Sequence, residues 1–138
     1  MNYIVWVVIA LVGYTFVPPL MNLATQEIPS DVATFGVAAM LATTAFGLSA
    51  LAREPVVDHL TGPSAVYVLG AGVCITVSIL AFFRALSLGP VSVVVPVFGL
   101  FLVTSSLVGV ALLGEPLTVN RAVGIGLAML AIVVISLD

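Results

Sequence analysis

The sequence predicts an all-α fold, a polytopic membrane helical bundle with five transmembrane helices. Hydrophobic residues make up 62% of the 138-residue chain, charged residues only 7%, and the mean hydropathy is +1.37. Because soluble domains carry about 25% charged residues, this chain lacks the side chains for a water-facing surface. Its charges also stand near the ends of apolar runs of roughly 20 residues, the length of helix that crosses a bilayer. The runs do not alternate apolar and polar residues as barrel strands do, so helices are expected.

Each expected helix is bounded by polar or helix-breaking residues. The five helices are expected at about residues 3–23, 32–52, 65–88, 91–113 and 118–137. The second follows Ser30 and Asp31, either of which is suited to cap its free N–H groups. The connection over residues 53–63 is charged and rich in proline, so it is expected as a polar loop outside the lipid. Gly114 is expected to stop the fourth helix.

These runs leave almost no chain for a soluble domain, so residues 1–138 are expected to form one transmembrane domain. No basic residue precedes the first apolar run, which is also longer than a usual signal-peptide core, so it is expected to stay as a helix. Cys74 is the only cysteine, which excludes an internal disulfide. The net charge of −3 argues against nucleic acid as a partner and leaves the lipid bilayer as the expected one.

Three arginines supply all the basic residues and decide the expected orientation. Arg53 and Arg121 fall on the side that carries the N-terminus, and Arg84 falls on the other. The positive-inside rule therefore favours a cytoplasmic N-terminus by one charge only, which allows insertion in both orientations. We expect a multi-pass protein of the cell (plasma or inner) membrane.

Polar and helix-breaking residues inside the expected helices mark a candidate solute cavity. Pro96 removes one backbone hydrogen bond in mid-helix and frees the carbonyl of Ser92. At membrane depth such a carbonyl persists only within protein or beside water, although a proline kink without any site is also common. The candidate cavity residues are Tyr14, Thr15, Thr76, Ser78, Arg84, Pro96 and Thr104. The first, third and fourth expected helices should lie nearest to the cavity.

Arg84 is the one charge inside an expected helix, and two interpretations of it stay open. It lies about one turn from the helix end, so its guanidinium can reach the headgroups while its stem stays in the lipid. Alternatively, it anchors a carboxylate or phosphate of the solute.

The sequence lacks the motifs of catalysis, of cofactor binding and of metal binding. No Asp, Glu or His lies deep in an expected helix. There is no HExxH motif, no paired carboxylate and no phosphate-binding loop, and no histidine is placed to activate a serine. We therefore expect no enzyme activity, no cofactor and no metal.

Several motifs resemble the EamA-type domain of the drug/metabolite transporter superfamily. They are the stretch 81–92 (AFFRALSLGPVS), then Val95-Pro96-Val97, the stretch 112–118 (LLGEPLT) and Gly124-Ile125-Gly126. The resemblance extends over essentially the whole chain. The chain departs from the family pattern near Met21 and Asn22, where a basic residue is common in the family. The resemblance implies transport of small metabolites, by two such domains that together form ten helices with inverted halves.

The stretch 112–118 contains a turn between the last two expected helices, and we expect its role to be structural. Glu115 precedes the N-terminus of the last expected helix, where a carboxylate is favoured, and Arg121 lies about one turn further on. We expect Gly114, Glu115, Pro116 and Arg121 to form a structural turn, with contact between Glu115 and the solute as the alternative.

Together these observations predict a half-size transporter subunit that moves a small organic metabolite by alternating access. An antiparallel homodimer, or an oppositely oriented paralogue, would rebuild the inverted repeat. Two alternatives stay open, a non-transporting accessory or assembly protein and a subunit of a flippase for lipid-linked sugars.

Overall fold

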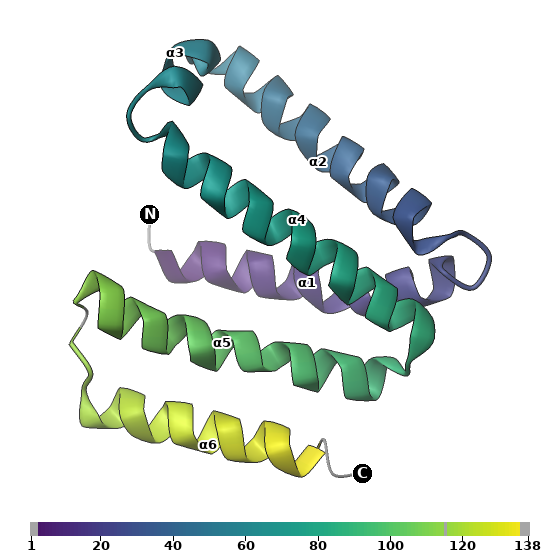
Figure 1. Ribbon diagram of the computed structural model, residues 1–138, viewed down its shortest axis with the longest axis vertical. Coiled ribbons are helices and arrows are strands. Elements are labelled where there is room, and N and C mark those ends of the chain that lie inside the picture. Colours follow the sequence, from purple (N-terminus) through teal and green to yellow (C-terminus); the bar gives the residue numbers. More distant parts are fainter. Residues whose placement is uncertain (1–2, 115, 136–138) are drawn as a thin grey trace. The chain divides into compact units, whose positions relative to one another are not determined.

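The computed structural model of the chain describes residues 3–114 and 116–135, in which every regular element is an α-helix (Figure 1). The helices are α1 (Tyr3–Ala24), α2 (Ser30–Leu51), α3 (Val56–Thr61), α4 (Ala65–Leu88), α5 (Val91–Leu113) and α6 (Val119–Ile135). The all-α prediction is confirmed. Of these, α1, α2, α4 and α5 are long and apolar enough to cross a membrane. The fifth expected span corresponds to α6, which has 17 described residues, and the end of that expected helix lies outside the described residues.

Two local expectations were wrong. The helix α2 begins at Ser30, after Pro29, and has no side-chain cap from Ser30 or Asp31. The extended backbone of Pro29 places its carbonyl to accept the N–H of Ala33 at 3.0 Å, so the helix starts before the expected capping residues can flank it. The expected loop 53–63 contains the short helix α3, whose first turn is closed by the N–H of His59 donating to the carbonyl of Pro55 at 3.1 Å.

Two long helices end on a residue with left-handed backbone. Gly114 has φ 66° after α5, as expected for a residue without a Cβ. Arg53 has φ 55° after α2, although its Cβ makes this conformation costly. The N–H of Glu54 donates to the carbonyl of Ser49 at 3.1 Å, and that of Arg53 to the carbonyl of Ala50 at 3.2 Å. These two bonds form a Schellman motif that holds Arg53 in place.

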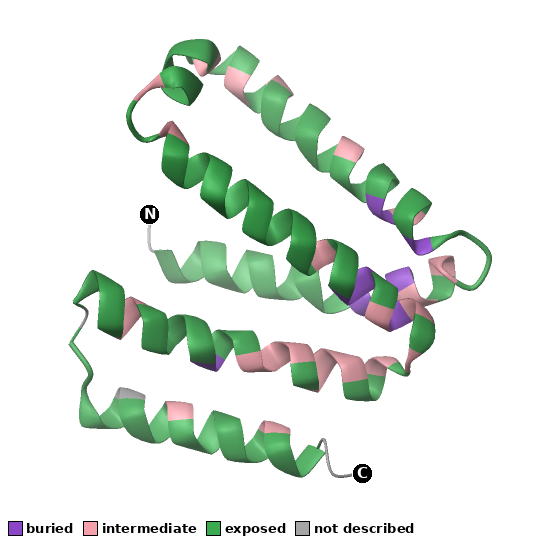
Figure 2. Cartoon of the chain, in the orientation of Figure 1, coloured by how far each residue is buried: buried purple, intermediate pink, exposed green. Residues whose placement is uncertain are grey.

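The chain divides into two compact units, residues 1–88 and 89–138. In the first unit, α4 contacts α1, α2 and α3 (Figure 1). Its buried residues gather where α1 and α4 end and α2 begins (Figure 2). They are Pro18, Met21, Ser30, Thr34, Phe82, Phe83 and Leu86. The core of this unit therefore lies at one end of it.

The second unit is a hairpin of α5 and α6, which contact each other. A Cβ added at Gly99 of α5 would lie 3.9 Å from Cδ1 of Ile132 in α6, so this glycine lies where the two helices approach. Val103 is the buried residue of α5 among those described. Pro96 lies inside α5, and the helix continues through it.

Large apolar side chains cover the exposed faces of the long helices. Leu51 is 83% exposed, Leu112 79% and Tyr67 78%. Such surfaces suit hydrocarbon better than water, because soluble monomers rarely expose extensive apolar surface. Together with the four long apolar helices, they make this a multi-pass membrane protein.

Candidate solute pocket

A pocket of about 490 Å³ lies in the first unit between α1, α2 and α4. Most of its lining is apolar, and four polar residues interrupt it. The lining residues are Tyr14, Val17, Asp31, Thr34, Phe35, Val37, Ala38, Leu41, Ile75, Thr76, Ile79, Leu80 and Phe83. The volume falls in the range of small-molecule sites, which are typically apolar with a few polar groups. This pocket is the candidate functional site.

The two threonines of the pocket both donate their hydroxyl hydrogen to their own helix. Thr34 Oγ1 donates to the carbonyl of Ser30 at 2.7 Å, and Thr76 Oγ1 donates to the carbonyl of Gly72 at 2.7 Å. Their oxygen lone pairs can still accept hydrogen bonds. Asp31 stands in the first turn of α2, where the helix dipole favours its carboxylate.

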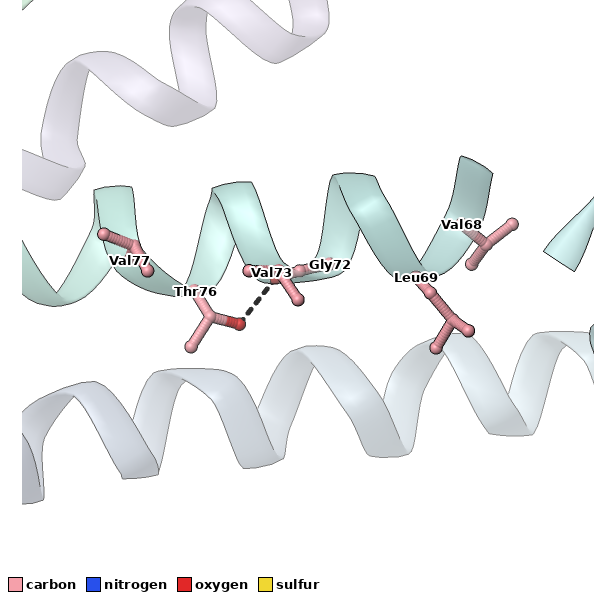
Figure 3. A pocket seen from close by; sticks show the side chains of 6 residues that line it. All are labelled: Val68, Leu69, Gly72, Val73, Thr76 and Val77. Carbon is pink, nitrogen blue, oxygen red and sulfur yellow. Dashed lines mark hydrogen bonds between the residues drawn. The ribbon is translucent and has the colours of Figure 1, made fainter. Parts of the chain in front are cut away.

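Thr76 also lines a second hollow, of about 370 Å³, on the surface of α4 (Figure 3). Its lining residues all come from that helix, and the bond from Thr76 to Gly72 lies within it. A third hollow, of about 520 Å³, lies beside α3 and is lined in part by Glu54 and His59. His59 Nε2 lies 3.7 Å from Glu54 Oε2, and both side chains are exposed. These two hollows are weaker candidates for a solute site. One is lined by a single helix, and the other lies at the exposed connection that contains α3.

The structure brings together two of the candidate residues selected from the sequence. Tyr14 of α1 and Thr76 of α4 line the same pocket. Thr15 is exposed and donates its hydroxyl to the carbonyl of Leu11 at 2.7 Å. Ser78 and Arg84 are exposed on α4 and do not line the pocket.

The remaining candidates belong to the second unit, so their role in a cavity stays a prediction. Pro96 is half-buried in α5, and Thr104 is exposed. The hydroxyl of Thr104 lies 3.3 Å from the carbonyl of Leu100 and 3.2 Å from that of Phe101, so it bonds to its own helix.

The expected turn of Gly114, Glu115, Pro116 and Arg121 is described only in part. Gly114 ends α5 with left-handed backbone, as expected. Glu115 lies outside the described residues. Arg121 lies in α6, but its side chain is not among those described, so the part of Glu115 and Arg121 in the structural turn stays a prediction.

Sequence reasoning missed the contribution of α2. Asp31 and Thr34 line the pocket, although the first, third and fourth expected helices were favoured. A usable signal was present, because both residues lie in the first turns of an apolar helix, where a polar side chain can face a neighbouring helix near the membrane surface.

Sequence reasoning also missed a bond between two helices of the first unit. Asn22 Nδ2 of α1 donates to the carbonyl of Leu86 in α4 at 2.7 Å. Leu86 lies among the last four residues of α4, whose carbonyls have no N–H donor within the helix, and Pro90, four positions on, has no N–H to supply one. Asn22 therefore supplies a donor to a carbonyl that Pro90 cannot satisfy.

A family model described as the EamA-like transporter family matches residues 1–137. No curated protein and no solved structure matches the chain. The matched range includes all the apolar helices and the residues that line the pocket. The chain belongs to the EamA-like transporter family.

Proposed function

We propose that this protein is a transporter subunit that moves a small organic metabolite across a cell membrane by alternating access. The observation that carries the proposal is the pocket between α1, α2 and α4, in a chain whose family consists of transporters. A pocket with an apolar wall and a few polar groups is suited to hold a solute during passage. The chemistry of the lining supports transport and not catalysis, because it offers no nucleophile paired with a base.

The proposed assembly is a pair of domains with opposite orientation, in which each domain supplies five helices. A second copy of this chain, or an oppositely oriented paralogue, would provide the other half. The arginines support this proposal, because Arg53 and Arg121 oppose Arg84 with a difference of only one charge. We propose the plasma or inner membrane as its location, with a weak preference for a cytoplasmic N-terminus.

Flux through purified protein tests the transport proposal. Proteoliposomes containing only this chain would be loaded with a defined mixture of amino acids, sugars, nucleosides and amines, and the released compounds identified by mass spectrometry. We expect selective release of one class, and impaired release from a Pro96→Ala variant. The matched control is Pro63→Ala, which changes an exposed proline before α4. Absence of solute-selective release would favour the alternative of an accessory or assembly protein.

Locked orientations test the proposed assembly. Two arginines inserted after Ala52 should hold one orientation, and two inserted after Leu88 should hold the other. We expect activity from the two variants only when they are expressed together. Full activity from either variant alone would exclude the antiparallel homodimer.

Single cysteines at positions 27, 58, 87 and 116, in a chain with Cys74 replaced, should react from alternating sides of the membrane.

A further inference from the structure

The pocket between α1, α2 and α4 carries an unbalanced negative charge. Asp31 supplies the only carboxyl group among its lining residues, which include no arginine, lysine or histidine. Within the described part of the chain, the one ion pair joins His59 and Glu54, so the Asp31 carboxylate has no such partner there. The hydroxyl of Ser30 lies 3.5 Å from Oδ1 of Asp31. The charge of the pocket is thus complementary to a cation.

The hydrogen-bonding groups of the pocket point to the same conclusion. Thr34 and Thr76 have given their hydroxyl hydrogens to helix carbonyls and present only lone pairs. Pro18 has no N–H, so the carbonyl of Tyr14 lacks its usual helical donor four residues on. A carboxylate is also an acceptor only. The phenol O–H of Tyr14 is the remaining side-chain donor among the polar lining residues, so acceptors predominate, and a ligand rich in N–H donors would satisfy them.

The length and the apolar wall of the pocket indicate the shape of the rest of the ligand. Asp31 and Leu41 both line the pocket from α2, and ten residues of helix separate them by about 15 Å. Between these ends the wall is formed by side chains such as Phe35, Ile79 and Phe83. A ligand that fits has a polar head at one end and an apolar body of several carbons.

From charge, hydrogen bonding and shape we infer that this pocket binds an amphipathic organic amine in its protonated form. The ammonium group lies at Asp31 and donates to the acceptors around it, and the apolar body lies along α2 and α4. The inference rests on the proposed function, since it names the class of solute for the same pocket. It assigns solute recognition to Asp31 rather than to Arg84, which does not line the pocket.

A matched set of three probes tests the inference by binding to the purified full chain in detergent. The probes are 4-phenylbutylammonium, the neutral 4-phenylbutanol and the anionic 4-phenylbutyrate, which share one apolar body. We expect the ammonium to bind tightest and the carboxylate weakest, measured by calorimetry at neutral pH. Because Asp31 is exposed, replacing it by asparagine should weaken ammonium binding by about fivefold and leave binding of the alcohol unchanged.

Two control variants separate the charge of Asp31 from other effects. Asp58→Asn makes the same change in α3, outside the pocket, and should leave ammonium binding within about twofold of the native protein. Asp31→Glu keeps the charge and should retain binding. Equal affinity for the three probes, tighter binding of the carboxylate, or an Asp31→Asn variant that behaves like Asp58→Asn would each overturn the inference. No binding of any probe would also overturn it, and would favour a lipid chain or a helix of a second copy in the pocket.

Flux measurements distinguish failure of this inference from failure of the proposed function. If the ammonium binds as expected but proteoliposomes release no solute, the transport proposal fails while the assignment of the pocket stands. If proteoliposomes release solutes without regard to their charge, and Asp31→Asn has no effect, transport stands and the amine assignment fails.

Discussion

The two ends of the first unit differ in how they are held together. Where α1 and α4 end and α2 begins, Phe83 and Leu86 are 1% and 0% exposed, and Asn22 joins two helices by a hydrogen bond. At the other end, α3 has no buried residue, and its ion pair to Glu54 lies in solvent. There Arg53 holds a left-handed backbone conformation that glycine would adopt at lower cost.

This difference indicates where the stability of the unit resides. Burial and an interhelical hydrogen bond act together at the first end, whereas the second end depends on local backbone bonds and an exposed charge pair. Substitutions at the first end should therefore lower the free energy of unfolding strongly, and those at the second end should change it little. Four comparisons between variants test this, each measured by SDS titration of the purified protein in mixed micelles.

The largest effect is expected from Leu86→Ala, which empties a fully buried site. We expect a loss of about 3 kcal/mol in the free energy of unfolding, because both burial and packing contacts are lost. Leu88→Ala is the matched control, since Leu88 lies two residues further on the same helix and is 76% exposed. It should cost under about 0.5 kcal/mol. Equal losses for the two leucines would mean that this end is not the packed core.

The next effect concerns the hydrogen bond between α1 and α4. Asn22→Ala should cost about 1–2 kcal/mol, because the carbonyl of Leu86 loses its donor and Pro90 cannot replace it. Asn22→Asp, which is similar in size but has no N–H, should cost at least as much at neutral pH. The control Gln26→Ala removes an exposed amide just after α1 and should be close to neutral. A neutral Asn22→Ala variant would show that water or another group satisfies the carbonyl.

A smaller difference, between two variants of the same residue, is expected at the end of α2. Arg53→Gly should be more stable than Arg53→Ala by about 1 kcal/mol, because both lose the charge but only glycine adopts φ 55° without strain. The comparison thus isolates the backbone from the electrostatics. If alanine proves as stable as glycine, the Schellman motif is not retained in solution.

The smallest effect is expected for the exposed pair of His59 and Glu54. His59→Ala and Glu54→Ala should each change the free energy of unfolding by less than about 0.5 kcal/mol, because water screens both side chains. The double variant should equal the sum of the single ones. A measurable coupling between them would make the α3 end more firmly held than its exposure indicates.

The fold could be predicted closely because lipid imposes a simple rule on the chain. Residues 65–88 and 91–113 were expected as helices and are observed with the same bounds, since Gly89 and Pro90 stand between them and Arg84, near the end of the first, is the only charge in either range. The short helix α3 was missed, because six polar and apolar residues show no usable periodicity. The left-handed backbone of Arg53 was missed as well, because that conformation is normally expected at a glycine and position 53 is an arginine.

The candidate pocket could be predicted only in part. Tyr14 and Thr76 were selected as polar or aromatic residues deep in apolar helices, and they line one pocket. Asp31 was interpreted as a helix cap, because it precedes the expected helix 32–52. The local sequence does not indicate which other helices pack beside it. The bond from Asn22 to Leu86 was accessible in principle, since Pro90 must leave one carbonyl in α4 without its helical donor.

The same bond has a consequence for how the protein is made. Its two residues lie 64 positions apart in the chain. At a synthesis rate of about 5–20 residues per second, Asn22 leaves the ribosome roughly 3–13 s before Leu86. During this interval the amide must be satisfied by water or headgroups, so the end of α1 is expected to stay near the membrane surface. The bond forms only after α4 has been synthesised, and early chain termination would leave Asn22 without this partner.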